Sequence, residues 1–211
     1  MSVEHTRDHD HDHTPPPDQD GPWSDYQYLE TAVRELLVEK GVFSNDDVRK
    51  MIERMDTRSP SRGARVVAKA WTDPAFKKRL LADGRGAVEE LGIDIEPVRL
   101  IVVENTEAEH NVVVCTLCSC YPRNLLCLPP DWYKARAYRS RAVREPRAVL
   151  AEFGTELPEN VTVRVHDSTA DMRYMVLPRR PDGTEGLGEA ELAGLVTRDS
   201  MIGVSLPKTP A

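Results

Sequence analysis

The sequence predicts an α+β protein in which an N-terminal helical arm is followed by a layered α/β domain. Apolar residues recur at helical spacing through residues 23–84, whereas from about residue 99 they form short β-branched runs bounded by turn residues. The first 22 residues contain almost no apolar side chains. We therefore expect a disordered tail over residues 1–22, a helical arm over residues 23–84 and the layered domain over residues 85–211.

The N-terminal tail is rich in histidine, aspartate and proline. Such a composition cannot bury enough apolar surface to fold, so we expect disorder. Imidazole and carboxylate groups bind divalent metals, and two interpretations remain open, a solvated tail and a weakly chelating segment. The histidines concerned are His5, His9, His11 and His13.

Four helices are predicted in the arm. Ser24 to Gln27 forms a capping box, and the apolar positions after it continue at helical spacing until Gly41. Ser44 caps a second helix, a third covers residues 63–71, and Pro74 starts a fourth that ends near Gly84. The first two helices have more apolar surface than they bury against each other, so they contact either a partner subunit or the rest of the chain. Their apolar residues are Tyr26, Leu29, Val33, Leu36 and Leu37, then Val48, Met51, Ile52 and Met55.

The layered domain is predicted from four short strands with helices between them. The strands are rich in valine, isoleucine and leucine, and helices are expected around residues 145–152 and 188–196. Mixed strands and helices of this kind are typical of α+β or layered α/β domains. The predicted strands cover residues 100–103, 112–114, 161–165 and 174–177.

Composition and charge argue against several function classes. The chain has 211 residues, of which 40% are hydrophobic and 30% charged, as in soluble globular domains. Its net charge of -7 opposes binding to nucleic acid. Apolar runs fall short of the roughly 20 residues that cross a bilayer, and the N-terminus is acidic where a signal peptide is basic and apolar. We expect a cytoplasmic protein without membrane contact.

Three of the four cysteines lie within six residues, at Cys115, Cys118 and Cys120. A metal bound to the Cys118 thiolate closes chelate rings with the peptide nitrogens of Ser119 and Cys120 and then with the sulfur of Cys120. These four donors can share a plane, Cys115 can add a fifth on the axis, and a sixth position stays open. Peptide nitrogens bind metal only when deprotonated. The spacing therefore indicates a strongly acidic, low-spin trivalent ion such as Co(III) or Fe(III).

Two other interpretations of the cysteines remain to be weighed. A structural zinc site needs four tetrahedral ligands, usually in two separated pairs, and Cys127 would have to be the fourth. A disulfide framework is disfavoured because the cytosol keeps thiols reduced. Cys127 itself lies in an apolar run and is predicted to be a small buried hydrophobe.

The segment Cys115-Thr-Leu-Cys118-Ser-Cys120-Tyr121 resembles the metal-binding motif of nitrile hydratase α subunits and of the related thiocyanate hydrolase subunit. Thr116 and Tyr121 match the cobalt form of that family. The resemblance extends over roughly residues 26–206, and it agrees with a layered fold. Other stretches that carry it are residues 66–74, 128–133, 138–141, 144–147, 179–184 and 195–203.

The resemblance implies an enzyme subunit that hydrates a nitrile to the amide at a non-corrin Co(III) centre, with Fe(III) as the alternative. Its metal ligands would be Cys115, Cys118, Ser119 and Cys120, with Cys118 oxidised to the sulfinic and Cys120 to the sulfenic acid. These two cysteines would be the catalytic residues, and the Cys120 oxygen is a candidate nucleophile or base. The ion would polarise the nitrile or make a bound water more acidic. Asp167 and Arg173 would orient the site.

The same resemblance implies partners. A β-type subunit would supply two arginines to the oxidised cysteines and would contact the helical arm, so this chain alone holds an incomplete site. A metallochaperone is a further candidate partner, and the histidine-rich tail leaves a metal-carrying role open as an alternative to catalysis.

Arg123 departs from the usual pattern of cobalt nitrile hydratases, which have tryptophan at this place beside the substrate pocket. A cation there is similar to the thiocyanate hydrolase pattern, whose substrate is an anion. Because nitrile hydratases are the more frequent members of the family, a small-molecule nitrile is still the first prediction for the substrate. The alternative is thiocyanate, converted to carbonyl sulfide and ammonia.

Overall fold

The computed structural model describes residues 24–56, 59–95 and 98–210. The predicted tail over residues 1–22, with its four histidines, lies outside this part of the chain. The chain divides into two compact units, with the boundary after Met51. In the part that the structure describes, no helix combines the length and the apolar character needed to span a bilayer.

The first unit contains α1 (Asp25–Glu39) and the beginning of α2 (Asn45–Asp56). As predicted, α1 begins with a capping box, in which the Ser24 N–H donates to Gln27 Oε1 at 2.7 Å. Ser44 and Asp47 cap α2 in the same reciprocal way, at 2.9 and 3.1 Å. No residue of α1 is buried, and Tyr26 is 84% exposed. Contact of this arm with a partner stays a prediction.

The second unit contains four strands at the places that the sequence predicts. They form two parallel pairs, β1 with β4 and β2 with β3. In the register of the second pair, Val114 lies opposite Asp167, so the end of β2 lies beside the end of β3. The strands are β1 (Arg99–Glu104), β2 (Glu109–Val114), β3 (Thr162–Asp167) and β4 (Met172–Leu177).

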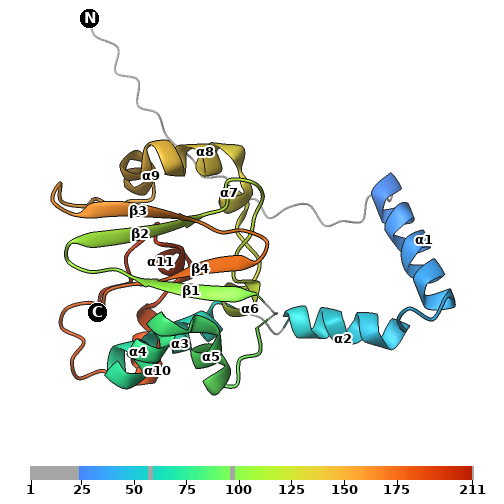
Figure 1. The fold of residues 1–211 in the computed structure, drawn as a ribbon, viewed down its shortest axis with the longest axis horizontal. Coiled ribbons are helices and arrows are strands. Elements are labelled where there is room, and N and C mark those ends of the chain that lie inside the picture. The colour runs from blue at the N-terminus through green and yellow to red at the C-terminus, as the bar shows by residue number, and fades with distance from the viewer. Residues whose placement is uncertain (1–23, 57–58, 96–97, 211) are drawn as a thin grey trace, which may run out of the picture. The chain divides into compact units, whose positions relative to one another are not determined.

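Helices cover both sides of the strand pairs (Figure 1). On one side, α8 and α9 contact β2 and β3, next to α7. On the other side, α4 and α5 contact β1, and α3 packs against α10, while α11 contacts β2, β4 and α3. The arrangement confirms the predicted α+β class. The helices are α3 (Ser61–Thr72), α4 (Pro74–Ala82), α5 (Gly84–Glu90), α6 (Arg123–Leu126), α7 (Asp131–Lys134), α8 (Arg136–Arg144), α9 (Pro146–Glu152), α10 (Glu189–Leu195) and α11 (Arg198–Ile202).

The sequence placed the boundary between the helical arm and the layered domain at residue 84, whereas the two compact units of the structure divide after Met51. Helices α3 and α4 belong to the compact unit together with the strands, because Val66, Phe76 and Leu80 are fully buried in its core. Their apolar faces are covered by the domain itself, so within residues 23–84 only the segment before Ile52 lies in the separate unit. The short helices α5, α6, α7, α8 and α11 were not predicted from the sequence.

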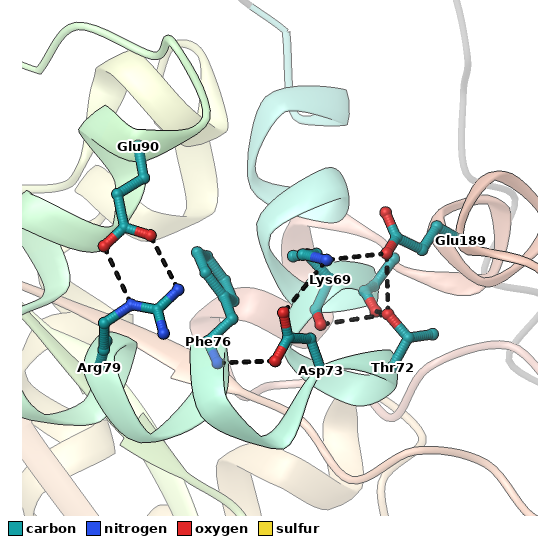
Figure 2. A network of polar contacts seen from close by, with 8 residues as sticks. Lys69, Thr72, Asp73, Phe76, Arg79, Glu90 and Glu189 are labelled. Carbon is teal, nitrogen blue, oxygen red and sulfur yellow. Dashed lines mark hydrogen bonds and ion pairs between the residues drawn. The ribbon is translucent and has the colours of Figure 1, made fainter.

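Polar side chains join the helices on the β1 side of the domain (Figure 2). Asp73 caps α4 by accepting from the Phe76 N–H at 2.9 Å, and this hydrogen bond, followed by Lys69, lowers the pKa of its carboxyl. Lys69 also lies 3.5 Å from Glu189 on α10. Arg79 on α4 donates two hydrogen bonds to Glu90 on α5. The contacts are exposed, so they orient the helices more than they stabilise the fold.

A buried polar network lies beside β2. His110 Nε2 lies 2.7 Å from the Gly203 carbonyl oxygen, and His110 Nδ1 lies 3.2 Å from Asn105 Nδ2. Asn105 Oδ1 accepts from the Asn111 N–H at 2.7 Å, and Asn111 Oδ1 lies 2.7 Å from His166 Nε2. Burial lowers the pKa of His110, which therefore stays neutral, donates from Nε2 and accepts at Nδ1. This network attaches the end of α11 to the strand that leads to the cysteines.

Candidate metal centre

The three clustered cysteines begin immediately after β2. Cys115 is 1% exposed, whereas Cys118 is exposed and Cys120 half-buried. Their sulfurs lie within 4.8 Å of one another, and among the described residues they are the one group of three or more histidine, cysteine and acidic side chains close enough to hold a metal ion. Cys127 is outside this group. The end of a rigid strand therefore holds three thiols together, one buried and two reaching the surface of the domain.

The distances between the sulfurs carry information about coordination geometry. The Cys115 and Cys118 sulfurs are 3.5 Å apart, and those of Cys118 and Cys120 are 3.2 Å apart. Two sulfurs at about 2.3 Å from one ion are separated by about 3.3 Å at a right angle and by about 3.8 Å at the tetrahedral angle. The Cys118–Cys120 distance matches the right angle and the Cys115–Cys118 distance lies between the two values, so the three sulfurs can occupy neighbouring positions around an octahedral ion.

Asp167 holds the cysteine loop at the end of β3. Its two carboxylate oxygens accept from the Thr116 N–H at 2.9 Å and from the Thr116 hydroxyl at 2.6 Å. Arg139 on α8 donates to the Thr116 carbonyl oxygen at 3.2 Å. The loop is also tied to itself, because the Cys118 N–H points to the Cys115 sulfur at 3.3 Å. These contacts fix the turn between the first two thiols.

Buried tyrosines support the same loop from the helical layer. Tyr133 donates to the Cys120 carbonyl oxygen at 2.9 Å, and Tyr138 donates to the Val113 carbonyl oxygen at 2.7 Å. The Tyr121 hydroxyl donates to the Leu126 carbonyl oxygen at 2.8 Å. Sequence reasoning did not find these roles, since tyrosines near the motif show no sign of what their hydroxyl groups bind. The hydrogen bond from Arg139 to the Thr116 carbonyl oxygen was not predicted from the sequence either.

The two arginines singled out in the sequence lie near each other. Arg123 begins α6 and is exposed, Arg173 lies on β4 opposite Leu100, and both line one small cavity with Tyr121. The positive charge of Arg173 acts to lower the pKa of Cys120, so the guanidinium is within electrostatic reach of the cluster.

The thiols of Cys118 and Cys120 differ in acidity when no metal is bound. Hydrogen bonds with Cys120 and then Cys115 lower the pKa of Cys118 to about 7. Burial, followed by the contact with Cys118, raises the pKa of Cys120 to about 12. Since the thiolate is the form that binds metal and reacts with electrophiles, Cys118 is the first of the two to ionise.

This difference predicts selective labelling of the metal-free chain. Short pulses of iodoacetamide should modify Cys118 first, at a rate that rises with pH through about 7 as its thiolate forms, while Cys120 lags throughout. Peptide mass spectrometry between about pH 6 and 8 measures both rates. Faster labelling of Cys120 than of Cys118 would contradict the assignment.

Cys127 has a strained backbone. It ends α6 with φ 66° and ψ -156°, and among the described residues it is the one non-glycine residue with positive φ. This region of backbone space is tolerated almost only by glycine. The thiol is half-buried, in place of the full burial that the sequence predicted.

Replacing Cys127 by glycine should therefore stabilise the protein. Relief of strain outweighs the extra chain entropy of glycine, and we expect a gain of about 1 kcal/mol in the free energy of unfolding. Urea unfolding of the metal-free chain measures it. Cys127→Ala is the matched control, because it removes the thiol but keeps the Cβ, and it should give no gain.

Comparison with known proteins identifies the family. The family described as "Nitrile hydratase, alpha chain" matches residues 24–205. This chain belongs to that family. The α subunit of the low-molecular weight cobalt-containing nitrile hydratase of Rhodococcus rhodochrous is 52% identical over 182 residues, which cover 85% of this chain and 88% of that protein.

Subunits of thiocyanate hydrolase are also similar to this chain. The thiocyanate hydrolase γ subunit of Thiobacillus thioparus is 47% identical over 197 residues, covering 88% of this chain and 81% of that subunit. A solved structure of recombinant thiocyanate hydrolase with partially modified cobalt centres is 47% identical, with a TM-score of 0.84 over 88% of this chain and 91% of that chain. The predicted enzyme family and its thiocyanate hydrolase relationship are thus confirmed.

Proposed function

We propose that this protein is the metal-binding catalytic subunit of a nitrile hydratase that converts a nitrile to its amide at a Co(III) centre. The observation that carries the proposal is the cluster of three sulfurs directly after β2, with neighbouring sulfurs 3.5 and 3.2 Å apart. Cobalt is favoured over iron because the relative from Rhodococcus rhodochrous contains cobalt.

The proposed metal ligands are the sulfurs of Cys115, Cys118 and Cys120 with the peptide nitrogens of Ser119 and Cys120. Bound there, a trivalent ion would supply Lewis acidity toward a nitrile or water. Cys118 and Cys120 are the proposed catalytic residues, in sulfinic and sulfenic form, since both are accessible at the surface whereas Cys115 is buried. A buried Cys115 suits an unoxidised ligand.

The residues around the cluster would keep its geometry and charge. Asp167 holds Thr116, and therefore the turn between Cys115 and Cys118, through two hydrogen bonds. Arg173 would offer N–H donors to the oxygens of the oxidised cysteines, which carry negative charge.

Removing the Asp167 carboxylate should loosen the site. For Asp167→Ala we expect metal affinity or activity to fall about 10- to 100-fold, because Thr116 loses both acceptors and the loop is no longer fixed to β3. Metal content after dialysis against a chelator measures the effect. Asp171→Ala, an exposed carboxylate in the following turn, is the control, and an equal loss there would contradict the specific role.

A β-type subunit is the proposed partner. The exposed apolar residues of α1, such as Tyr26 and Leu29, offer a surface for it, and the cluster itself opens to the exterior of the domain. Donors from that partner would complete the hydrogen bonding of the oxidised cysteines. A metallochaperone and a cytoplasmic location remain parts of this proposal.

The alternative function is thiocyanate hydrolysis. It is favoured by the exposed cation Arg123, which lies near Arg173, and by the 47% identity to a thiocyanate hydrolase subunit. Two cations near one site suit an anionic substrate.

One set of experiments tests both functions. The chain is expressed with its partner subunits in cobalt medium, its metal content is measured, and mass spectrometry is used to find added oxygens on Cys118 and Cys120. An aliphatic nitrile, a heteroaromatic nitrile and thiocyanate are then supplied as substrates. Amide formation without ammonia from thiocyanate supports the proposal. Ammonia release with no amide supports the alternative, and stoichiometric zinc with unmodified cysteines contradicts both.

A further inference from the structure

Buried polar atoms without a partner are few in the described residues. The side-chain atoms concerned are Asn124 Oδ1, Arg139 Nε and Arg173 Nη1. Buried polar groups are normally paired, so each such atom needs an explanation. Asn124 and Arg173 line the same cavity, although one lies on α6 and the other on β4.

The two unpaired atoms have complementary chemistry. The amide oxygen of Asn124 only accepts hydrogen bonds, and the guanidinium nitrogen of Arg173 only donates them. A molecule that accepts from one and donates to the other would satisfy both. Water does this, whereas a chloride ion offers no donor to the amide oxygen and a second cation has no acceptor for the guanidinium.

The size of the cavity selects among such molecules. Its volume is about 20 Å³, and one water needs roughly 10–15 Å³ of such space. The space is therefore too small for an organic nitrile. The rest of its wall is largely apolar. Arg123, which also lines the cavity, is exposed to solvent. The apolar residues of the wall are Ile95, Val98, Leu100 and Leu125.

We propose that this cavity binds a single structural water molecule, which accepts a hydrogen bond from Arg173 and donates one to Asn124. Through this water, Asn124 is a positioning residue for the Arg173 guanidinium. Asn124 suits the role because it is 5% exposed and lies in the segment that follows the cysteine loop, two residues after Pro122. The positioning of Arg173 toward the oxidised cysteines rests on the proposed function, whereas the water site does not.

Two variants of Asn124 separate hydrogen bonding from packing. Asn124→Leu keeps a similar side-chain volume but removes the acceptor, and Asn124→Asp keeps an acceptor. Each is prepared as the full chain, assembled with its partner subunits and loaded with cobalt. High-resolution crystal structures should show a water within hydrogen-bond distance of Arg173 and residue 124 in the unchanged protein, and no water there in Asn124→Leu.

Kinetics and thermal unfolding complete the test. We expect kcat of Asn124→Leu to fall about tenfold with KM unchanged, and Asn124→Asp to keep most of the activity at a similar melting temperature. Direct protein contacts to Asn124 Oδ1 and Arg173 Nη1 in place of a water would overturn the proposal, and so would equal losses in the two variants. A water found in the crystal together with no nitrile hydration would overturn the proposed function and leave the water site established.

Discussion

Replacing Cys118 by alanine should abolish stoichiometric cobalt binding and, with it, nitrile hydration. Its sulfur is in contact with both of the others, 3.5 Å from that of Cys115 and 3.2 Å from that of Cys120. Its removal therefore takes away the sulfur ligand that joins the other two in the cluster. It is also the thiol with the lowered pKa, and it supplies thiolate for the ion near neutral pH. Elemental analysis of the purified complex measures the loss.

Cys127→Gly is the control for this experiment. Cys127 lies outside the cluster of three sulfurs, and its replacement should leave the cobalt content unchanged. Cobalt that stays stoichiometric in Cys118→Ala would contradict the proposed ligand set. Loss of cobalt in Cys127→Gly would show that the fourth thiol is a ligand and would restore the tetrahedral zinc interpretation.

The chemistry of the cysteine loop was predictable because its donors are neighbours in sequence. Cys115, Cys118, Ser119 and Cys120 are brought together by chain connectivity alone, so their spacing contains most of the information about the site. The hydrogen bonds of Asp167 to Thr116 depend instead on the pairing of β2 with β3, which joins residues 51 positions apart. Only the family resemblance pointed to Asp167 and Arg173, and it gave no contact for either.

The fold was predictable where local signals are strong. The four strands are β-branched runs between turn residues, and α1 and α2 start at capping boxes or reciprocal caps. Periodicity shows that a helix has an apolar face but not what covers it, and for this reason α3 and α4 were assigned to the arm. The short helices α5, α6, α7, α8 and α11 depend on packing in the domain, which leaves little local signal.

Replacing Gly203 by alanine should destabilise the domain strongly. Gly203 ends α11 with φ 91°, and a Cβ added there would lie 1.9 Å from the Asn111 carbonyl oxygen and 3.0 Å from its carbonyl carbon. Both atoms belong to the backbone of β2, which is held by its pairing with β3. We expect a loss of about 3–5 kcal/mol in the free energy of unfolding, from the left-handed conformation together with the clash.

Gly183→Ala separates these two causes. Gly183 has φ 76°, but nothing lies within 4 Å of an added Cβ, so the variant should lose only about 1–2 kcal/mol, from the backbone conformation. Urea unfolding of the metal-free chain compares the two, and equal losses would show that the close approach to Asn111 contributes nothing.

The clash at Gly203 should also affect the metal site. Gly203 accepts from His110 on β2, and this strand ends at Val114, next to Cys115. A displacement of β2 should therefore reduce cobalt content in any Gly203→Ala protein that folds, while Gly183→Ala retains it.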